Sequence, residues 1–159
     1  FKEQGIKILS QYVDFVFSNH PKVLEREMSF SFDIKDVTIK GSIDRIDKDR
    51  NGVRIIDYKT SKIASSAKSS LQLAIYCLYL LQSSNEKIKG LPNKAVLHFL
   101  RDEENPIKEH SFKTMELKSV EKVIEKTAKS IRNQEFSPKK GKHCDWCDYK
   151  NLLCPEWGD

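Results

Sequence analysis

The sequence has no long apolar run, no internal repeat and no low-complexity tract. Without eighteen or more consecutive apolar residues it supplies no transmembrane helix, so we expect no membrane partner. Its first residues, Phe1 to Gln4, lack the pattern of a secretory signal, and we expect a cytoplasmic protein. The absence of an initiator Met predicts that the chain is a piece of a longer protein.

Cysteine is scarce, and its four copies are unevenly placed. A secreted disulfide scaffold spreads its cysteines more evenly. Here three of them, Cys144, Cys147 and Cys154, lie within the last 16 residues. Such a cluster in a reducing compartment predicts a zinc or iron–sulfur site. The fourth, Cys77, lies in an apolar segment and is expected to be a packing residue.

Length and charge narrow the class of protein further. The 159 residues suit one domain with one core, and 28 Lys+Arg against 23 Asp+Glu give a formal charge of +5. A mildly basic chain permits a nucleic-acid partner without requiring one. Five lysines in predicted loops are candidates for contacts with phosphates: Lys62, Lys68, Lys139, Lys140 and Lys142.

The spacing of apolar residues predicts an alternation of helices and strands. Helices are expected over 6–18, 71–81 and 115–131, and strands over 27–34, 37–47, 53–59, 95–100 and 107–112. The first helix is expected to bury a broad face. The order α-β-β-β-α-β-β-α predicts an α/β fold with a mixed central β-sheet flanked by helices. We expect a core over 1–133 and an irregular cysteine-bearing tail over 134–159, packed on the same domain.

Two acidic motifs carry the chemistry. Asp57 and Lys59 are two apart on a predicted strand, so their side chains share a face. The register of the hairpin decides whether Asp44 joins them. A two-residue turn at Asn51-Gly52 places Asp44 opposite Lys59, and a four-residue loop, Asp49 to Gly52, places it opposite Asp57. An odd loop would turn Asp44 to the other face.

Two carboxylates beside an amine are typical of a site for a hard cation such as Mg²⁺. The main-chain carbonyl of Tyr58 is a further candidate ligand. Lys59 would orient or deprotonate the attacking water, or stabilise charge on a phosphate, in the hydrolysis of a phosphodiester. The alternative is a pair of ordinary ion pairs on a solvated strand. It is less favoured because Asp57 ends an apolar strand, and charges are rarely buried without a partner or a metal.

Taken together, these motifs resemble the RecB-like branch of the PD-(D/E)XK nucleases. The resemblance rests on G-x-x-D-R-x-D at 41–47, D-Y-K-T at 57–60 and Q-L-x-x-Y at 72–76. It implies a restriction-endonuclease-like core and a deoxyribonuclease dependent on Mg²⁺ or Mn²⁺. Asp44 and Asp57 would be its metal ligands and Lys59 its catalytic lysine.

This branch often forms the C-terminal nuclease of helicase–nuclease proteins in DNA repair and recombination. It also includes the CRISPR-associated spacer-acquisition nucleases. The resemblance therefore implies DNA, single-stranded or with ends, and a helicase domain as partners.

Gln72 and Tyr76 are four apart and share one face of a helix. The residues alone favour a satisfied amide and an ordinary core tyrosine. The resemblance instead implies that the pair lies at the active-site cleft, where it holds DNA or supports the metal ligands. Glu27 matches an acidic position common in these nucleases and is expected to support the site or lie at the surface.

The tail reads C-x2-C-x6-C-P and resembles the terminal cysteines of many RecB-like nucleases. The resemblance implies a [4Fe–4S] cluster whose fourth cysteine would precede Phe1, as would a first helix bearing a histidine. We expect the chain to lack that helix. His143, beside Cys144, leaves a zinc Cys₃His site open.

Two alternatives to an active nuclease remain, and the missing upstream helix favours the first of them. One is a non-catalytic, metal-stapled DNA-binding or structural module derived from such a nuclease. The other is a small zinc-binding interaction domain, which explains the tail alone. The intact set of Asp44, Asp57 and Lys59 favours the enzyme.

Overall fold

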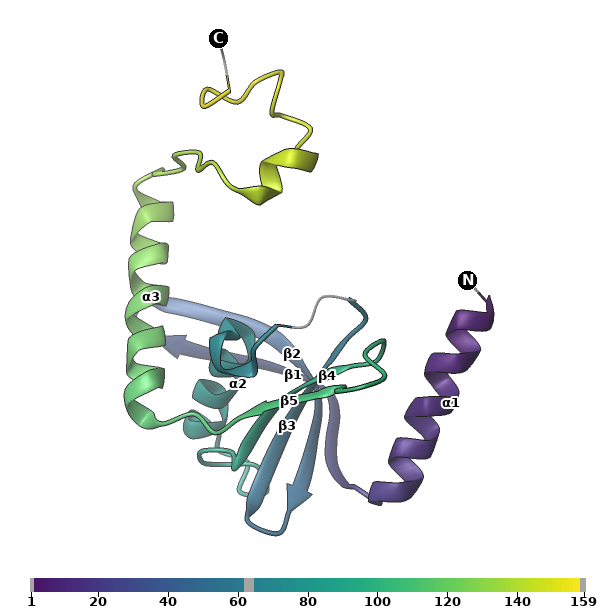
Figure 1. Ribbon diagram of the computed structural model, residues 1–159. Coiled ribbons are helices and arrows are strands. Elements are labelled where there is room, and N and C mark those ends of the chain that lie inside the picture. Colours follow the sequence, from purple (N-terminus) through teal and green to yellow (C-terminus); the bar gives the residue numbers. More distant parts are fainter. Residues whose placement is uncertain (1, 62–64, 158–159) are drawn as a thin grey trace. The chain divides into compact units, whose positions relative to one another are not determined.

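A computed structural model describes residues 2–61 and 65–157, and Lys62 lies outside the described residues (Figure 1). The chain forms two compact units, residues 1–123 and 124–159, and each is described by itself. Among the described residues, no helix is both long enough and apolar enough to cross a membrane.

The first unit follows the predicted order of elements. It contains α1 (Lys2–Asn19), β1 (Lys22–Ile34), β2 (Val37–Asp49), β3 (Gly52–Lys59), the short helix η1 (Ala67–Ser69), α2 (Leu71–Gln82), β4 (Lys94–Phe99), β5 (Ile107–His110) and the first part of α3 (Thr114–Arg132). The predicted α-β-β-β-α-β-β-α order is confirmed. The largest shift of a boundary is in β1, which begins at Lys22 rather than at residue 27.

The five strands form one mixed sheet in the order β1-β2-β3-β4-β5. Only β3 and β4 are parallel, and the other neighbours are antiparallel. Parallel neighbours need a crossover connection, which α2 supplies between β3 and β4. The predicted mixed sheet flanked by helices is confirmed.

Helix α2 covers one face of the sheet and supplies much of the core. Its buried residues are Leu73, Ala74, Tyr76, Cys77, Leu78 and Leu80. The ring of Phe30 on β1 packs edge-on against Tyr76 and stacks on Tyr79, with centroid distances of 5.7 and 4.9 Å. Burial raises the pKa of Cys77 to about 12, so this thiol stays neutral and packs as predicted.

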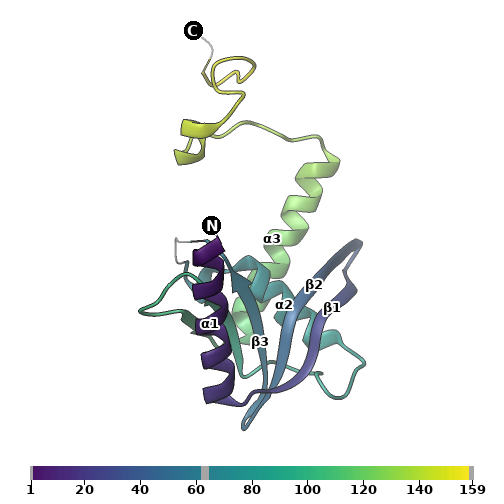
Figure 2. The ribbon, with the colours of Figure 1, turned by 90° about the vertical axis from the view of Figure 1, so that its right-hand side faces the viewer.

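Helix α1 lies on the opposite face of the sheet from α2 (Figure 2). It contacts the sheet through Tyr12 and Phe15, whose rings meet Tyr58 and His98. The expectation of a broad buried face is wrong, because no residue of α1 is buried. Four of its apolar side chains are between 45% and 70% exposed: Ile6, Leu9, Val13 and Phe17. One stripe of α1 meets the sheet, and no described element of the first unit covers the outer side.

Gly41 opens the first acidic motif where the packing leaves no room for a side chain. A Cβ at this position would lie 2.7 Å from Cζ of Phe30. Phe30 pairs with Gly41 across the β1–β2 ladder and is itself buried against α2. The glycine is therefore needed for close approach of an aromatic ring to the backbone.

We expect Gly41→Ala to lower the free energy of unfolding by about 1–3 kcal/mol, because the added methyl displaces the Phe30 ring from Tyr76 and Tyr79. Urea denaturation measures this change. Gly5→Ala is the matched control, since its Cβ would meet nothing within 4 Å. In a helix that replacement is neutral or stabilising. Similar effects of the two substitutions would contradict the packing argument.

Candidate active site

The β2–β3 hairpin sets the position of the first acidic motif. Its ladder pairs Asp49 with Gly52, Lys48 with Val53 and Arg45 with Ile56. This is the register of the four-residue alternative, in which Asp44 comes opposite Asp57. The turn itself is made by Arg50 and Asn51, and Gly52 has a φ of 140°, a conformation that favours glycine.

Beyond Arg45 and Ile56 the two strands separate. The described pairs between β2 and β3 end there, whereas β2 stays paired with β1 back to Val37. Oδ2 of Asp44 accepts a hydrogen bond of 2.8 Å from the main-chain N–H of Tyr58. A side chain thus satisfies a donor that a regular ladder would have paired with backbone. Asp44 is thereby held at the opening of the hairpin, next to the end of β3.

A chain of close contacts links β3 to α2. Nζ of Lys59 lies 2.6 Å from Oδ2 of Asp57 and donates to Oε1 of Gln72 at 2.7 Å. Nε2 of Gln72 in turn donates to the hydroxyl of Tyr76 at 2.7 Å. The structure therefore brings Asp44, Asp57, Lys59, Gln72 and Tyr76 together, and Gln72 and Tyr76 share one helical face as the spacing predicts.

The carboxylate of Asp57 is the most deeply buried charge of this group, with 1% of the residue exposed. Burial raises its pKa, the nearby Asp44 adds to that effect, and Lys59 opposes it. Oδ2 has the ammonium of Lys59 beside it, yet within the described residues it accepts no well-aligned hydrogen bond. Burial also raises the pKa of Tyr76 to about 12, so its hydroxyl stays protonated.

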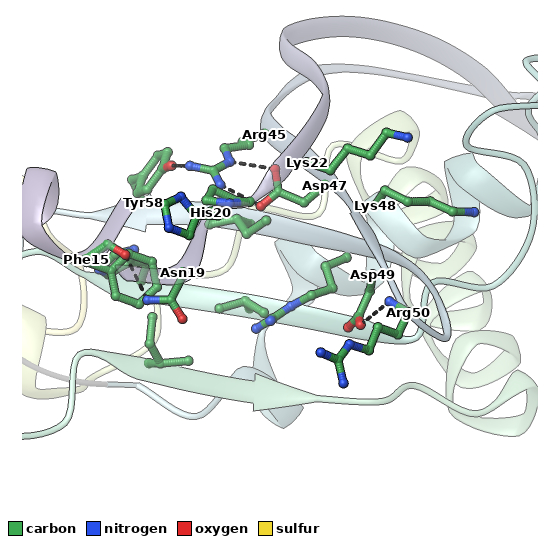
Figure 3. A pocket seen from close by; sticks show the side chains of 16 residues that line it. Phe15, Asn19, His20, Lys22, Arg45, Asp47, Lys48, Asp49, Arg50 and Tyr58 are labelled. Carbon is green, nitrogen blue, oxygen red and sulfur yellow. Dashed lines mark hydrogen bonds and ion pairs between the residues drawn. The ribbon is translucent and has the colours of Figure 1, made fainter. Parts of the chain in front are cut away.

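A buried polar network lies on the other face of the same strands (Figure 3). The guanidinium of Arg45 donates to both oxygens of Asp47 at 2.7 and 2.6 Å. Its Nη1 donates to the hydroxyls of Tyr12 and Tyr58, and these two hydroxyl oxygens are 2.8 Å apart. Although burial disfavours its charge, the contacts with Asp47 raise the pKa of Arg45, so it stays charged.

Sequence reasoning missed this network. The sequence motif predicts no further role for Asp47, and the ion-pair alternative joins Arg45 to Asp44. Two opposite charges two apart on an apolar strand are nevertheless a signal for a same-face ion pair. His98 gives a weaker signal, as one polar residue in the apolar run of β4. Burial and the charge of Arg45 lower the pKa of His98 to about 4, so its ring is neutral at physiological pH.

The second unit contains the predicted cysteine tail. Cys144, Cys147, Cys154 and His143 all line one cavity of about 440 Å³. Sγ of Cys144 accepts a hydrogen bond from the N–H of Gly141 at 3.3 Å. Across residues 2–61 and 65–157, however, no three His, Cys, Asp or Glu side chains come close enough to hold one metal ion. Thiol and imidazole side chains suit a thiophilic metal, but in this structure they lie too far apart to bind one ion together.

Comparison with known proteins agrees with this architecture. The sequence matches the PD-(D/E)XK nuclease superfamily over residues 3–155, nearly its whole length. The chain belongs to this superfamily. Eighteen chains of solved structures match, and one of them is described as "Crystal structure of SSO0001". It has 20% sequence identity and a TM-score of 0.57, and the match covers 98% of this chain and 70% of that one. At that identity it supports the fold alone. No curated protein matches.

The donor set of this PD-(D/E)XK chain suits the hard cations that such nucleases typically use, Mg²⁺ or Mn²⁺. Two carboxylates converge, and Asp57 presents a buried oxygen that lies beside Lys59 but accepts no well-aligned hydrogen bond from the residues that the structure describes. No third acidic or histidine side chain joins them in the part of the chain that the structure describes. Glu27 is exposed, has a φ of 46°, and lines a cavity together with Asp44. Further ligands would have to be main-chain carbonyl, water or phosphate oxygens.

We expect Asp57→Asn to raise the melting temperature at neutral pH without added metal. The pKa of Asp57 is raised in the folded state, so its contribution to stability is complete below the ordinary Asp pKa and is lost as the pH rises through the raised value. The gain from Asn should therefore shrink as the pH falls toward the ordinary value. Melting curves in EDTA across this range test it, with Asp14→Asn on exposed α1 as the control. A gain independent of pH would contradict the assignment.

Proposed function

We propose that this chain is a deoxyribonuclease that hydrolyses phosphodiester bonds with Mg²⁺ or Mn²⁺ held by Asp44 and Asp57. The observation that carries the proposal is the buried carboxylate of Asp57. Its Oδ2 lies 2.6 Å from the partly exposed ammonium of Lys59 and, among the described residues, accepts no well-aligned hydrogen bond. Asp44 lies across the opened hairpin, and the main-chain carbonyl of Tyr58, between Asp57 and Lys59, is a candidate third ligand. A bound divalent cation would activate water and neutralise charge developing on the phosphate.

Lys59 is placed for a catalytic role at this site. Its ammonium contacts Asp57 and Gln72 and remains partly exposed, so it can reach a phosphate or a water beside the carboxylates. There it would stabilise negative charge on the phosphate or orient the attacking water. Gln72 and Tyr76 act through it, because their hydrogen bonds fix the direction of the ammonium.

We also propose the finer placement of the chain in the RecB-like branch, as the nuclease part of a helicase–nuclease or related DNA repair protein. The order of the three motifs supports it, and so does the cysteine tail. The substrate would be single-stranded DNA or DNA with ends, and the compartment the cytoplasm. The second candidate remains a non-catalytic, metal-stapled DNA-binding module, which the lack of a third acidic ligand in the described residues favours.

We propose further that the tail binds a [4Fe–4S] cluster in the parent protein, with zinc as the alternative. Three thiols and one imidazole on a common cavity support a soft-metal site. A hydrogen bond from the main-chain N–H of Gly141 holds Sγ of Cys144 in this cavity. The tail's packing on the nuclease core stays a prediction.

We expect Asp57→Ala and Lys59→Ala each to reduce cleavage of a single-stranded oligonucleotide by about a hundredfold or more. The assay uses Mn²⁺ or Mg²⁺, and EDTA should abolish cleavage by the parent chain. Lys40→Ala, on the exposed part of β2, is the control that keeps activity. Cleavage at the parent rate by either site variant would remove the assignment, and absence of metal-dependent cleavage by the parent chain would favour the non-catalytic module.

Metal binding, measured without any cleavage, distinguishes the metal ligand Asp57 from the catalytic residue Lys59. Mn²⁺ should raise the melting temperature of the parent chain and of Lys59→Ala, because both keep the carboxylates. It should leave Asp57→Ala unchanged. Equal stabilisation of all three proteins would place the metal elsewhere.

For the tail, we expect the parent protein purified without oxygen to be brown and to contain iron and sulfide. Cys147→Ser should lose both, and because metal binding is coupled to folding, its melting temperature should fall as well. Colourless protein with one zinc per chain, released by His143→Ala, would exclude the cluster in favour of a Cys₃His site.

A further inference from the structure

A second cavity of the first unit is not used by the proposed reaction. It encloses about 370 Å³ where the end of α1 meets β2, β3 and β4, on the sheet face opposite α2 (Figure 3). That volume is typical of pockets that hold a small ligand. We call it the basic pocket, after the cationic residues that line it, which are Lys22, Arg45, Lys48, Arg50 and Arg54.

The charges of the basic pocket are only partly balanced. Arg45 pairs with Asp47 and Arg54 with Glu109, which leaves Lys22, Lys48 and Arg50. Its two carboxylates are already engaged, Asp47 by Arg45 and Asp49 by Asn93 and the N–H of Arg50. Lys22 and Lys48 face each other directly in the β1–β2 ladder. Neither ammonium forms an ion pair with a carboxylate in the part of the chain that the structure describes. Like charges opposite each other on a sheet are destabilising, and a bound anion would relieve them.

The floor of the basic pocket is aromatic and neutral. The rings of Phe15 and His98 meet edge-on at 4.8 Å, and Tyr58 lies 5.6 Å from His98. With its pKa lowered to about 4, His98 adds no charge to this floor at physiological pH. Flat neutral rings in a pocket lined by cationic residues suit a base joined to a phosphate, as in sites that bind single-stranded nucleic acids.

A neighbouring cavity connects the basic pocket with Asp44. It encloses about 570 Å³ and shares His20, Pro21, Arg45 and Tyr58 with the basic pocket. Its lining also includes Asp44. One continuous surface therefore runs from the basic pocket to a proposed metal ligand.

We propose that the basic pocket holds one nucleotide of the DNA strand whose scissile phosphate lies beside Asp44. Its phosphate would meet Lys22, Lys48 and Arg50, and its base would lie against the aromatic floor. The inference rests on the proposed function for the choice of DNA, but binding in the pocket needs neither metal nor cleavage.

Charge reversal of its cationic residues tests the pocket directly. The probe is a dye-labelled single-stranded oligonucleotide, titrated in EDTA. Lys48→Glu with Arg50→Glu should weaken binding about tenfold or more, since each phosphate contact contributes to affinity. Both residues are exposed, and Lys48→Glu places opposite charges across the ladder, so the fold should be kept. The matched control reverses two exposed lysines of α3, Lys118→Glu with Lys122→Glu, and should change binding less than twofold. Equal losses would show a general effect of net charge and overturn the pocket.

Competition identifies what the pocket recognises. Deoxyadenosine monophosphate should displace the oligonucleotide at lower concentration than inorganic phosphate or deoxyadenosine alone. Phe15→Leu should weaken binding of the nucleotide and leave binding of inorganic phosphate unchanged. Phosphate that competes as well as the nucleotide would overturn the base-binding floor. If DNA is bound in this pattern but never cut, the pocket stands and the proposed hydrolysis falls. If DNA is cut and the two double variants bind DNA equally well, the proposed hydrolysis stands and the pocket falls.

Discussion

Asp57 carries its carboxylate into the fold at the end of an apolar strand, where 1% of the residue is exposed. Burying a charge costs several kcal/mol unless it is paired and hydrogen-bonded. Lys59 offsets part of that cost, but its ammonium is shared with Gln72 and is partly in solvent. In the proposed function a divalent cation would offset the rest, and the neighbouring side chains are held in place by hydrogen bonds. Asp44 is fixed by the N–H of Tyr58, and Gln72 is fixed by Tyr76.

The two faces of β3 depend on each other. Asp57 and Lys59 point toward α2, whereas Tyr58 points toward α1, where its hydroxyl meets Tyr12 and Arg45. Movement of Tyr58 would disturb its main-chain N–H, and with it the hydrogen bond that holds Asp44. The buried network thus positions the site residues through their neighbours in sequence. This gives the network a positioning role, although none of its side chains needs to touch the reacting atoms.

Periodicity made most of the fold predictable, because buried and exposed residues alternate with period two in β1 and follow a helical face in α2. The same periodicities predict that Asp57 and Lys59 share one face of a strand, and that Gln72 and Tyr76 share one face of a helix. They could not supply the separation of β2 from β3, which depends on a side chain replacing a ladder bond at Asp44. Nor could they show that the apolar outer side of α1 is exposed. Periodicity identifies which residues of a helix are apolar, but not which of them another element covers.

Two electrostatic costs remain in the first unit. The carboxylate of Asp57 is buried beside a Lys59 ammonium that is shared with Gln72, and Lys22 and Lys48 face each other across a ladder. Folding alone disfavours both, because a neutral residue at either place would be more stable. The two have opposite signs, so no single simple ion relieves them together. A polyanion that brings a divalent cation to Asp57 and a phosphate to the lysines would relieve both. In the proposed function one ligand, a nucleic-acid strand with its metal, would meet both demands.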